Sequence, residues 1–208
     1  MRCKSSNEFV ELYNPTGSDV NMTGWYWCYF SSTRDWNNPY KAREFPDGAT
    51  IQAYSYYLIS VHGTVNPVPD WNLSYSSAQL SNSAGSVAIF PWKLQEKTVD
   101  EAKNGRIDAV GWGSVDHVYE NATTVVPPDG ESIERKANET GAIPGYGNAW
   151  DTDNNSNDFV LREVPNPQNS VSGPLPLLPE PVTLVLISIG LVMLVCIASF
   201  KRLKNESC

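Results

Sequence analysis

The C-terminal residues constrain the topology of this chain more than any other segment. Residues 182–200, VTLVLISIGLVMLVCIASF, form an uncharged apolar run of about nineteen residues. A helix of that length covers roughly the 30 Å of a bilayer's hydrocarbon core. Lys201, Arg202 and Lys204 follow at once, and the cytoplasmic ends of spans are enriched in such residues. The pattern predicts a transmembrane helix over 182–200, a basic cytoplasmic end over 201–208 and an extracytoplasmic body. A buried core helix is the alternative.

A short proline motif stands directly before the apolar run, at Pro179, Glu180 and Pro181. The motif, the span and the basic end together resemble a PEP-CTERM sorting signal, which in that family is recognised and cut by an exosortase. The resemblance implies release to the cell surface after C-terminal processing. A permanent anchor, which needs only the span and the basic end, is the alternative. Bacterial or archaeal origin stays open.

The part of the chain before the span is acidic. The formal net charge of the chain is -8, and residues 182–208 contribute three positive charges and one negative charge, which leaves -10 for the rest. No cluster of Lys and Arg appears in the sequence before the tail, so we expect no nucleic-acid partner. About 180 residues are enough for one domain with its own core.

Apolar alternation between turn signals predicts short strands and an all-β fold. In WYWCYF, residues 25–30, both alternating sets are apolar, so we expect a central strand that is covered on both faces. No stretch before the tail has the apolar spacing of a long soluble helix. The expected strands cover residues 8–13, 25–30, 49–51, 56–61, 86–90, 107–112 and 132–135.

This number of short strands predicts a β-sandwich of the immunoglobulin type. Ordered motifs along residues 7 to 170 also resemble a lamin-tail domain, an immunoglobulin-like module: NEFVELYNPTGSDVNMTGWYW, FPDGATIQAYSYYLI, DAVGWG, GESIERK and DTDNNSNDFVLREVPNPQNS. We therefore expect a lamin-tail domain over 7–163 and a stiff Pro-rich linker over 164–181. That family usually begins one strand earlier, and residues 1–6 lack the apolar core of a secretory signal, so we expect a truncated start.

The sharpest candidate site is the segment DTDNNSND, where oxygen-bearing side chains recur at every second position. Such side chains could gather around calcium, as in half of an EF-hand loop, although the glycine and the bidentate glutamate of that loop are not present. A turn whose side chains bond the backbone is the alternative. The candidate ligands are Asp151, Asp153, Asn155, Asn157 and Asp158.

Surface modification and sugar binding have their own candidate residues. Asn-x-Ser/Thr sequons, which can accept glycans, occur at Asn21, Asn72, Asn121, Asn138 and Asn154. Four tryptophans fall in expected loops and could stack on sugar rings, with packing at the edge of the core as the alternative: Trp36, Trp71, Trp92 and Trp150.

Catalytic chemistry has little support in the sequence. His62 and His117 are the only histidines, and neither accompanies a recognisable nucleophile motif or a zinc-ligand spacing. Cys3 and Cys28 are the only cysteines before the span, and they form either one disulfide or two separate thiols. We expect no catalytic residue and no cofactor other than the calcium considered above.

These features predict a non-enzymatic binding or structural module of the cell envelope, with one membrane pass and an extracytoplasmic domain. A carbohydrate-binding or calcium-dependent adhesion protein is the alternative. The expected partners are the membrane, an exosortase-type processing enzyme, and a surface protein or glycan.

Overall fold

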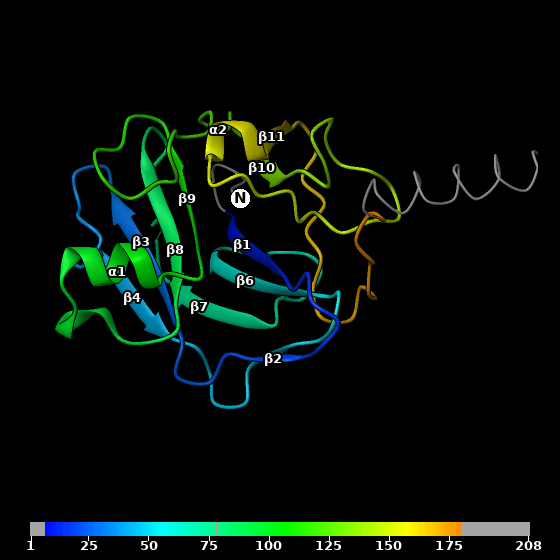
Figure 1. Ribbon diagram of the computed structural model, residues 1–208, viewed down its shortest axis with the longest axis horizontal. Helices are drawn as coiled ribbons and strands as arrows, with labels where there is room; N and C mark the ends of the chain where they lie inside the picture. Colours follow the sequence, from blue (N-terminus) through cyan, green and yellow to red (C-terminus); the bar gives the residue numbers. More distant parts are fainter. Residues whose placement is uncertain (1–6, 78, 180–208) are drawn as a thin grey trace, which may run out of the picture. The chain divides into compact units, whose positions relative to one another are not determined.

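Two β-sheets with an apolar core between them form most of the computed structural model, which describes residues 7–77 and 79–179 (Figure 1). The first sheet has the order β1-β6-β7, with strands Glu8–Tyr13, Tyr56–His62 and Trp71–Tyr75. The second has the order β4-β3-β8-β9, with strands Lys41–Glu44, Tyr26–Ser31, Gly85–Phe90 and Asp108–Trp112. The prediction of an all-β fold is confirmed, and each strand expected from the sequence is present.

Short ribbons and helices complete the described part of the chain. β2 (Val20–Asn21) pairs with β5 (Thr50–Ile51), and β10 (Ser132–Arg135) pairs with β11 (Phe159–Arg162). The helical segments are a 3-10 turn at Leu94–Glu96, α1 at Val99–Gly105 and α2 at Asn155–Asp158. All pairs of neighbouring strands are antiparallel except β6 and β7, which run parallel.

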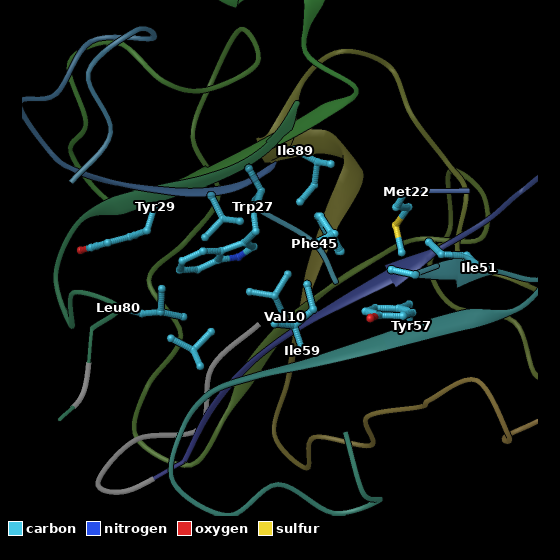
Figure 2. Close-up of a cluster of buried hydrophobic side chains, with 14 of the residues drawn as sticks. Val10, Met22, Trp27, Tyr29, Phe45, Ile51, Tyr57, Ile59, Leu80 and Ile89 are labelled. Carbon is cyan, nitrogen blue, oxygen red and sulfur yellow. The ribbon is translucent and has the colours of Figure 1, made fainter. Parts of the chain in front are cut away.

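Strand β3 supplies the centre of the core between the sheets. Trp27 and Tyr29 point into this core, and Figure 2 shows Trp27 facing Val10 and Ile59 of the opposite sheet. Trp27 and Ile59 are completely buried. Complete burial of one large apolar side chain is worth roughly 2 kcal/mol, so this facing set of side chains holds the two sheets together.

The other side of β3 is buried in a second apolar cluster. Cys28 and Phe30 point away from the first core and pack with Trp36, Leu94 and residue Ala102 of α1. All five side chains are buried. The four-stranded sheet is therefore covered on both faces, as the alternating apolar sets of residues 25–30 predict.

Helix α1 was not expected from the sequence, although its start carries a capping signal. Thr98 Oγ1 accepts a hydrogen bond from the backbone N–H of Glu101 (3.3 Å), and Glu101 Oε2 accepts one from the backbone N–H of Thr98 (2.8 Å). This reciprocal pair is a capping box. The helix has only 7 residues, too few to show a periodic apolar face in the sequence.

The segment expected to form a stalk is bound to the domain over residues 168–176, which we call the strap. The backbone N–H of Gln168 donates to the Glu11 carboxylate. Tyr13 Oη donates to the carbonyl oxygen of Leu175 (2.6 Å), whose own N–H donates to the carbonyl oxygen of Tyr54 (2.8 Å). Hydrogen bonds to groups on and beside β1 thus attach the strap to the domain. The compact unit accordingly continues to Leu177, beyond the expected domain end at residue 163.

The predicted span over 182–200, the basic end, Glu180, Pro181 and residues 1–6 lie outside the described residues. Within 7–77 and 79–179, no helix has the length and apolar character that crossing a bilayer requires.

Two glycines with similar backbone angles test how closely the chain packs after β9. Gly113 and Gly130 have φ of +69° and +81°, but an added Cβ would lie 2.0 Å from the Ser83 carbonyl oxygen at Gly113 and would meet nothing within 4 Å at Gly130. We expect Gly130→Ala to cost about 1 to 2 kcal/mol through backbone strain alone. Gly113→Ala should cost about 3 kcal/mol or more, because strain and overpacking add. Urea unfolding of both variants measures the difference, and equal costs would contradict the packing.

Candidate functional site

Arg135 of β10 lies at the centre of a cluster of carboxylates. Its Nη2 donates to both carboxylate oxygens of Asp108, at 2.7 and 2.8 Å. Its Nη1 lies 3.1 Å from Asp151 Oδ1 and 3.7 Å from Asp158 Oδ2, and its Cζ lies 4.7 Å from the ring centroid of Phe159. Only 13% of the side chain is exposed. A buried guanidinium needs such partners, so Arg135 is the cation around which these acids gather.

Glu120 is buried beside this cluster. Its Oε1 accepts hydrogen bonds from Arg106 Nη2 (2.9 Å) and Nε (3.1 Å), and its Oε2 accepts one from Asn155 Nδ2 (3.0 Å). Burial first, and the negative charge of Asp108 second, raise the pKa of Glu120 from 4.5 to about 7. The positive charges of Arg106 and Arg135 oppose this shift but do not cancel it.

Asn155 holds the turn of residues 151–158 against β9. Its side chain is completely buried, and its Oδ1 accepts from the backbone N–H groups of Gly111 (2.9 Å) and Glu120 (3.2 Å). Its Nδ2 donates to the carbonyl oxygen of Ala109 (2.9 Å) as well as to Glu120. These four bonds use the whole hydrogen-bonding capacity of the amide, so Asn155 has none left for a metal ion.

The same turn is closed by the buried carboxylate of Asp158. Asp158 Oδ1 accepts from Thr152 Oγ1 (2.6 Å), and Oδ2 accepts from the backbone N–H groups of Thr152 (3.0 Å) and Asn154 (3.1 Å). Asp151 Oδ1 accepts from the N–H of Asp153 (3.1 Å). Side chains that bond their own backbone are what the turn alternative predicts for this segment.

The structure brings two of the five candidate calcium ligands into one group. Oxygens of Asp151 and Asp158 lie within 4.8 Å of each other and of a Glu120 oxygen. The guanidinium of Arg135 already contacts both aspartates and lies 4.0 Å from Glu120 Oε2. The positive charge that these acids need is therefore supplied by the chain itself.

The remaining candidate ligands lie elsewhere. Asp153 is 85% exposed and pairs with Arg106, with 3.4 Å between Oδ1 and Nη2. Asn157 is exposed, and Asn155 makes the buried contacts already described. The candidate oxygens alternate along the sequence but do not meet at one point, because residues Asn155–Asp158 form the short helix α2 and not an extended loop.

The predicted glycosylation sequons share a local conformation. At Asn21, Asn72, Asn138 and Asn154, the side-chain oxygen accepts a hydrogen bond from the N–H two residues later, at 2.8 to 3.2 Å. Asn121 is exposed and has a φ of +52°. None of the five asparagines is buried, so each is within reach of a modifying enzyme.

None of the four tryptophans named as sugar-stacking candidates is fully exposed, and Trp71 begins strand β7 instead of lying in a loop as expected. Trp36 is 3% exposed, and Arg106 lies over its ring at 5.3 Å. The ring of Trp71 lies 4.8 Å from that of Phe45. Trp92 and Trp150 are partly buried. Trp36 therefore cannot offer a face to a sugar, and the packing alternative describes it better.

The histidines and the described cysteine take no part in the Arg135 cluster. His62 Nδ1 lies 2.8 Å from the carbonyl oxygen of Tyr75 and must donate to it, and His117 is exposed. Cys28 is a free thiol buried under α1. Cys3 lies outside the described residues.

Four charged residues of this site were not expected from the sequence. Asp108 directly precedes buried Ala109, and Arg135 and Glu120 each follow a buried apolar residue by two positions, Ile133 and Val118. A charged residue so close to buried apolar positions is the signal that could have found them. Arg106 carries no comparable signal, because it follows a polar helix end. Comparisons with protein-family models, with curated proteins and with solved structures gave no match for the chain.

The buried acids predict an unusual dependence of stability on pH. Burial raises the pKa values of Glu120 and Glu11 from an ordinary 4.5 to about 7 in the folded chain. The folded state therefore binds these protons more tightly, and their contribution is complete below about pH 4.5 and lost as the pH rises to about 7. For Glu120 it is on the order of 2 to 3 kcal/mol.

We expect the melting temperature to be higher at pH 5 than at pH 7.5, and Glu120→Gln to shrink this difference because an amide does not ionise. Glu139→Gln, at an exposed position, serves as the matched control and should leave the difference unchanged. Calorimetry at the two pH values measures the difference in melting temperature. If this difference is the same in Glu120→Gln as in the wild type, Glu120 does not have the raised pKa.

Proposed function

We propose that the chain is a non-enzymatic binding module of the cell envelope, carried by a C-terminal tail that sorts it to the surface or anchors it. The observation that carries this proposal is the junction at Leu177. There the compact unit ends, two residues before the Pro-Glu-Pro motif that opens the membrane-directed tail.

The fold supports an immunoglobulin-like domain of the lamin-tail type. Its two facing sheets and aromatic core are those that a small β-sandwich needs, and the lamin-tail motifs contribute β1, β3, β6, β9, β10 and β11. Such sandwiches commonly present ligands or partners from their edges and loops, and fold alone does not choose between these uses.

A binding role, and not catalysis, fits the way the reactive groups are used. The buried carboxylate of Glu120 accepts hydrogen bonds from Arg106, and that of Asp158 accepts them from backbone N–H groups. His62 donates to a carbonyl oxygen. Each of these groups is therefore engaged in contacts within the domain. Calcium-dependent adhesion has weaker support, because Arg135 stands among the acids that a calcium ion would need.

The mass of the mature C-terminus in native membrane and surface fractions tests the proposal. We expect a chain that ends near Pro181 and is found at the cell surface. Replacement of Pro179, Glu180 and Pro181 by alanine, which leaves the apolar run and the basic end intact, should abolish processing while keeping the chain in the membrane fraction. A wild-type chain that keeps Cys208 in the membrane would reject the sorting signal in favour of an anchor. A chain found only in the cytosol would reject the proposed location altogether.

A further inference from the structure

Five side chains at one edge of the fold form an alternating series of cations and tyrosine rings. Arg34 Cζ lies 5.9 Å from the ring centroid of Tyr40, and Lys41 Nζ lies 5.0 Å from the same centroid. Lys41 Nζ also lies 5.6 Å from the ring centroid of Tyr75, and Arg43 Cζ lies 5.1 Å from it. We call this series, Arg34, Tyr40, Lys41, Tyr75 and Arg43, the cation–tyrosine ladder.

The two sheets place the ladder where their outer strands meet (Figure 1). β4 is the outer strand of the second sheet, and Lys41 and Arg43 occupy alternate positions on it, opposite Tyr29 and Trp27 of β3. Alternate residues of a strand share a face, so both cations point to the side on which the first sheet lies. Tyr75 ends β7, the outer strand of that first sheet.

The ladder is open to solvent at Tyr40 and Arg43, whereas Arg34 is partly buried and Tyr75 packs against the core with its hydroxyl group buried. Tyr40 is 51% exposed, and Arg43 is also exposed. Lys41 lies between the two rings and is partly buried. The rings hold its ammonium group in place by cation–π attraction, which is worth about 0.5 to 1 kcal/mol at an exposed site.

The ladder cations differ from the arginines of the Arg135 cluster in having no acidic partner. Arg106 and Arg135 each contact a carboxylate, whereas no described carboxylate lies within 4 Å of the ladder cations. Arg34 Nη1 donates to Asn38 Oδ1 (2.9 Å), and Arg43 Nη1 donates to the carbonyl oxygen of Ala42 (3.1 Å). Neutral partners of this kind leave the positive charges uncompensated.

This local charge is an exception on an acidic body, and it corrects the expectation that no basic cluster precedes the tail. Arg34 is seven positions from Lys41 in the sequence, and the tyrosine that joins Lys41 to Arg43 comes from another sheet. Tyr40, Lys41 and Arg43 lie within four consecutive residues, but the contributions of Arg34 and Tyr75 cannot be read from neighbouring residues.

We propose that the cation–tyrosine ladder is a docking surface for an anionic polysaccharide, in which a sugar packs on the exposed ring of Tyr40 while acidic groups meet the three cations. Basic patches are a recurrent means of binding acidic glycans, and tyrosine combines an apolar face with a polar hydroxyl group. This inference rests on the proposed function only for the surface location at which such a polymer would be met.

The charge of the whole domain favours a glycan over nucleic acid. Duplex DNA carries one negative charge per roughly 1.7 Å of its axis, and a long run of such charges would be repelled by a body with a formal charge near -10. A polyuronate carries at most one charge per sugar, and its uncharged ring faces alternate with its carboxylates.

A purely structural role is the competing explanation. Inward-pointing charges on outer strands discourage edge-to-edge aggregation, and the ladder stands on two such strands. In that case substitutions in the ladder would change stability or solubility without changing the affinity for any glycan.

Calorimetric titration of the purified full chain in nonionic detergent with a galacturonate hexamer separates these explanations. We expect the double variant Lys41→Gln, Arg43→Gln to lose at least ten-fold in affinity and to show a weaker dependence on salt. The matched double variant Lys93→Gln, Lys103→Gln removes the same charge from exposed positions outside the ladder and should change the affinity less than two-fold. Tyr40→Ala should weaken binding while the net charge stays the same. Circular dichroism of each variant checks that the fold is intact.

Three results would overturn the proposal: no binding by the wild type, equal losses in the two double variants, or equal binding of a neutral hexasaccharide. Stronger binding of a single-stranded oligonucleotide than of the hexamer would replace the glycan with nucleic acid as the partner. Because this titration uses purified protein, its outcome is independent of where the chain resides in the cell. Failure of the ladder and failure of the envelope assignment can therefore be told apart.

Discussion

Burial of strand β3 on both faces is the constraint on which the rest of the fold depends. One face carries Trp27 and Tyr29, which require a second sheet, and the other carries Cys28 and Phe30, which require a separate cover. The first requirement is met by β1 and β6, and the second by the short helix α1 and the loops around it. A strand with only one apolar face would have left the four-stranded sheet open to water on one side. The outer strands, β4 and β7, then lie at the margin of the two sheets, where a polar surface such as the cation–tyrosine ladder can form.

The C-terminal part of the domain is joined to this core by polar contacts more than by apolar ones. Arg135 draws Asp108 of β9 and the 151–158 turn together, and Asn155 bonds the backbone of β9 directly. A buried ion pair adds little to stability compared with apolar packing, but removal of one member leaves an uncompensated charge and is strongly destabilising. The network therefore specifies where the last ribbon and the 151–158 turn lie. Asp151 and Asp158, two of the predicted calcium ligands, are the acids that contact Arg135. A calcium ion would therefore have to compete with Arg135 for them.

Local patterns along the chain were enough to predict the strands and the double burial of β3, because alternation directly reports which faces need cover. β4 was missed because three of its four residues are charged. β7 was missed although Trp71, Leu73 and Tyr75 alternate with two polar residues and pack against the core, so the same alternation could have found it. The candidate sites show the same division. Asp151 and Asp158 were recognised as a pair of acids, but Arg135, which lies between them in space, is 16 positions before Asp151. The contact of Lys41 with Tyr75 depends on how two sheets meet, which no window of sequence contains.

The reactivity of the Cys28 thiol tests the central claim that β3 is covered on both faces. Its side chain is completely buried, and burial also raises the pKa of the thiol, which lowers the reactive thiolate fraction. The measurement is mass-spectrometric detection of alkylation at the Cys28 peptide, in the presence of a reductant, as a function of time and urea concentration. We predict modification at the rate of global unfolding and complete modification in the unfolded chain. Modification of the native chain at the rate of an exposed thiol would show that the α1 side of β3 is open, and would contradict the account.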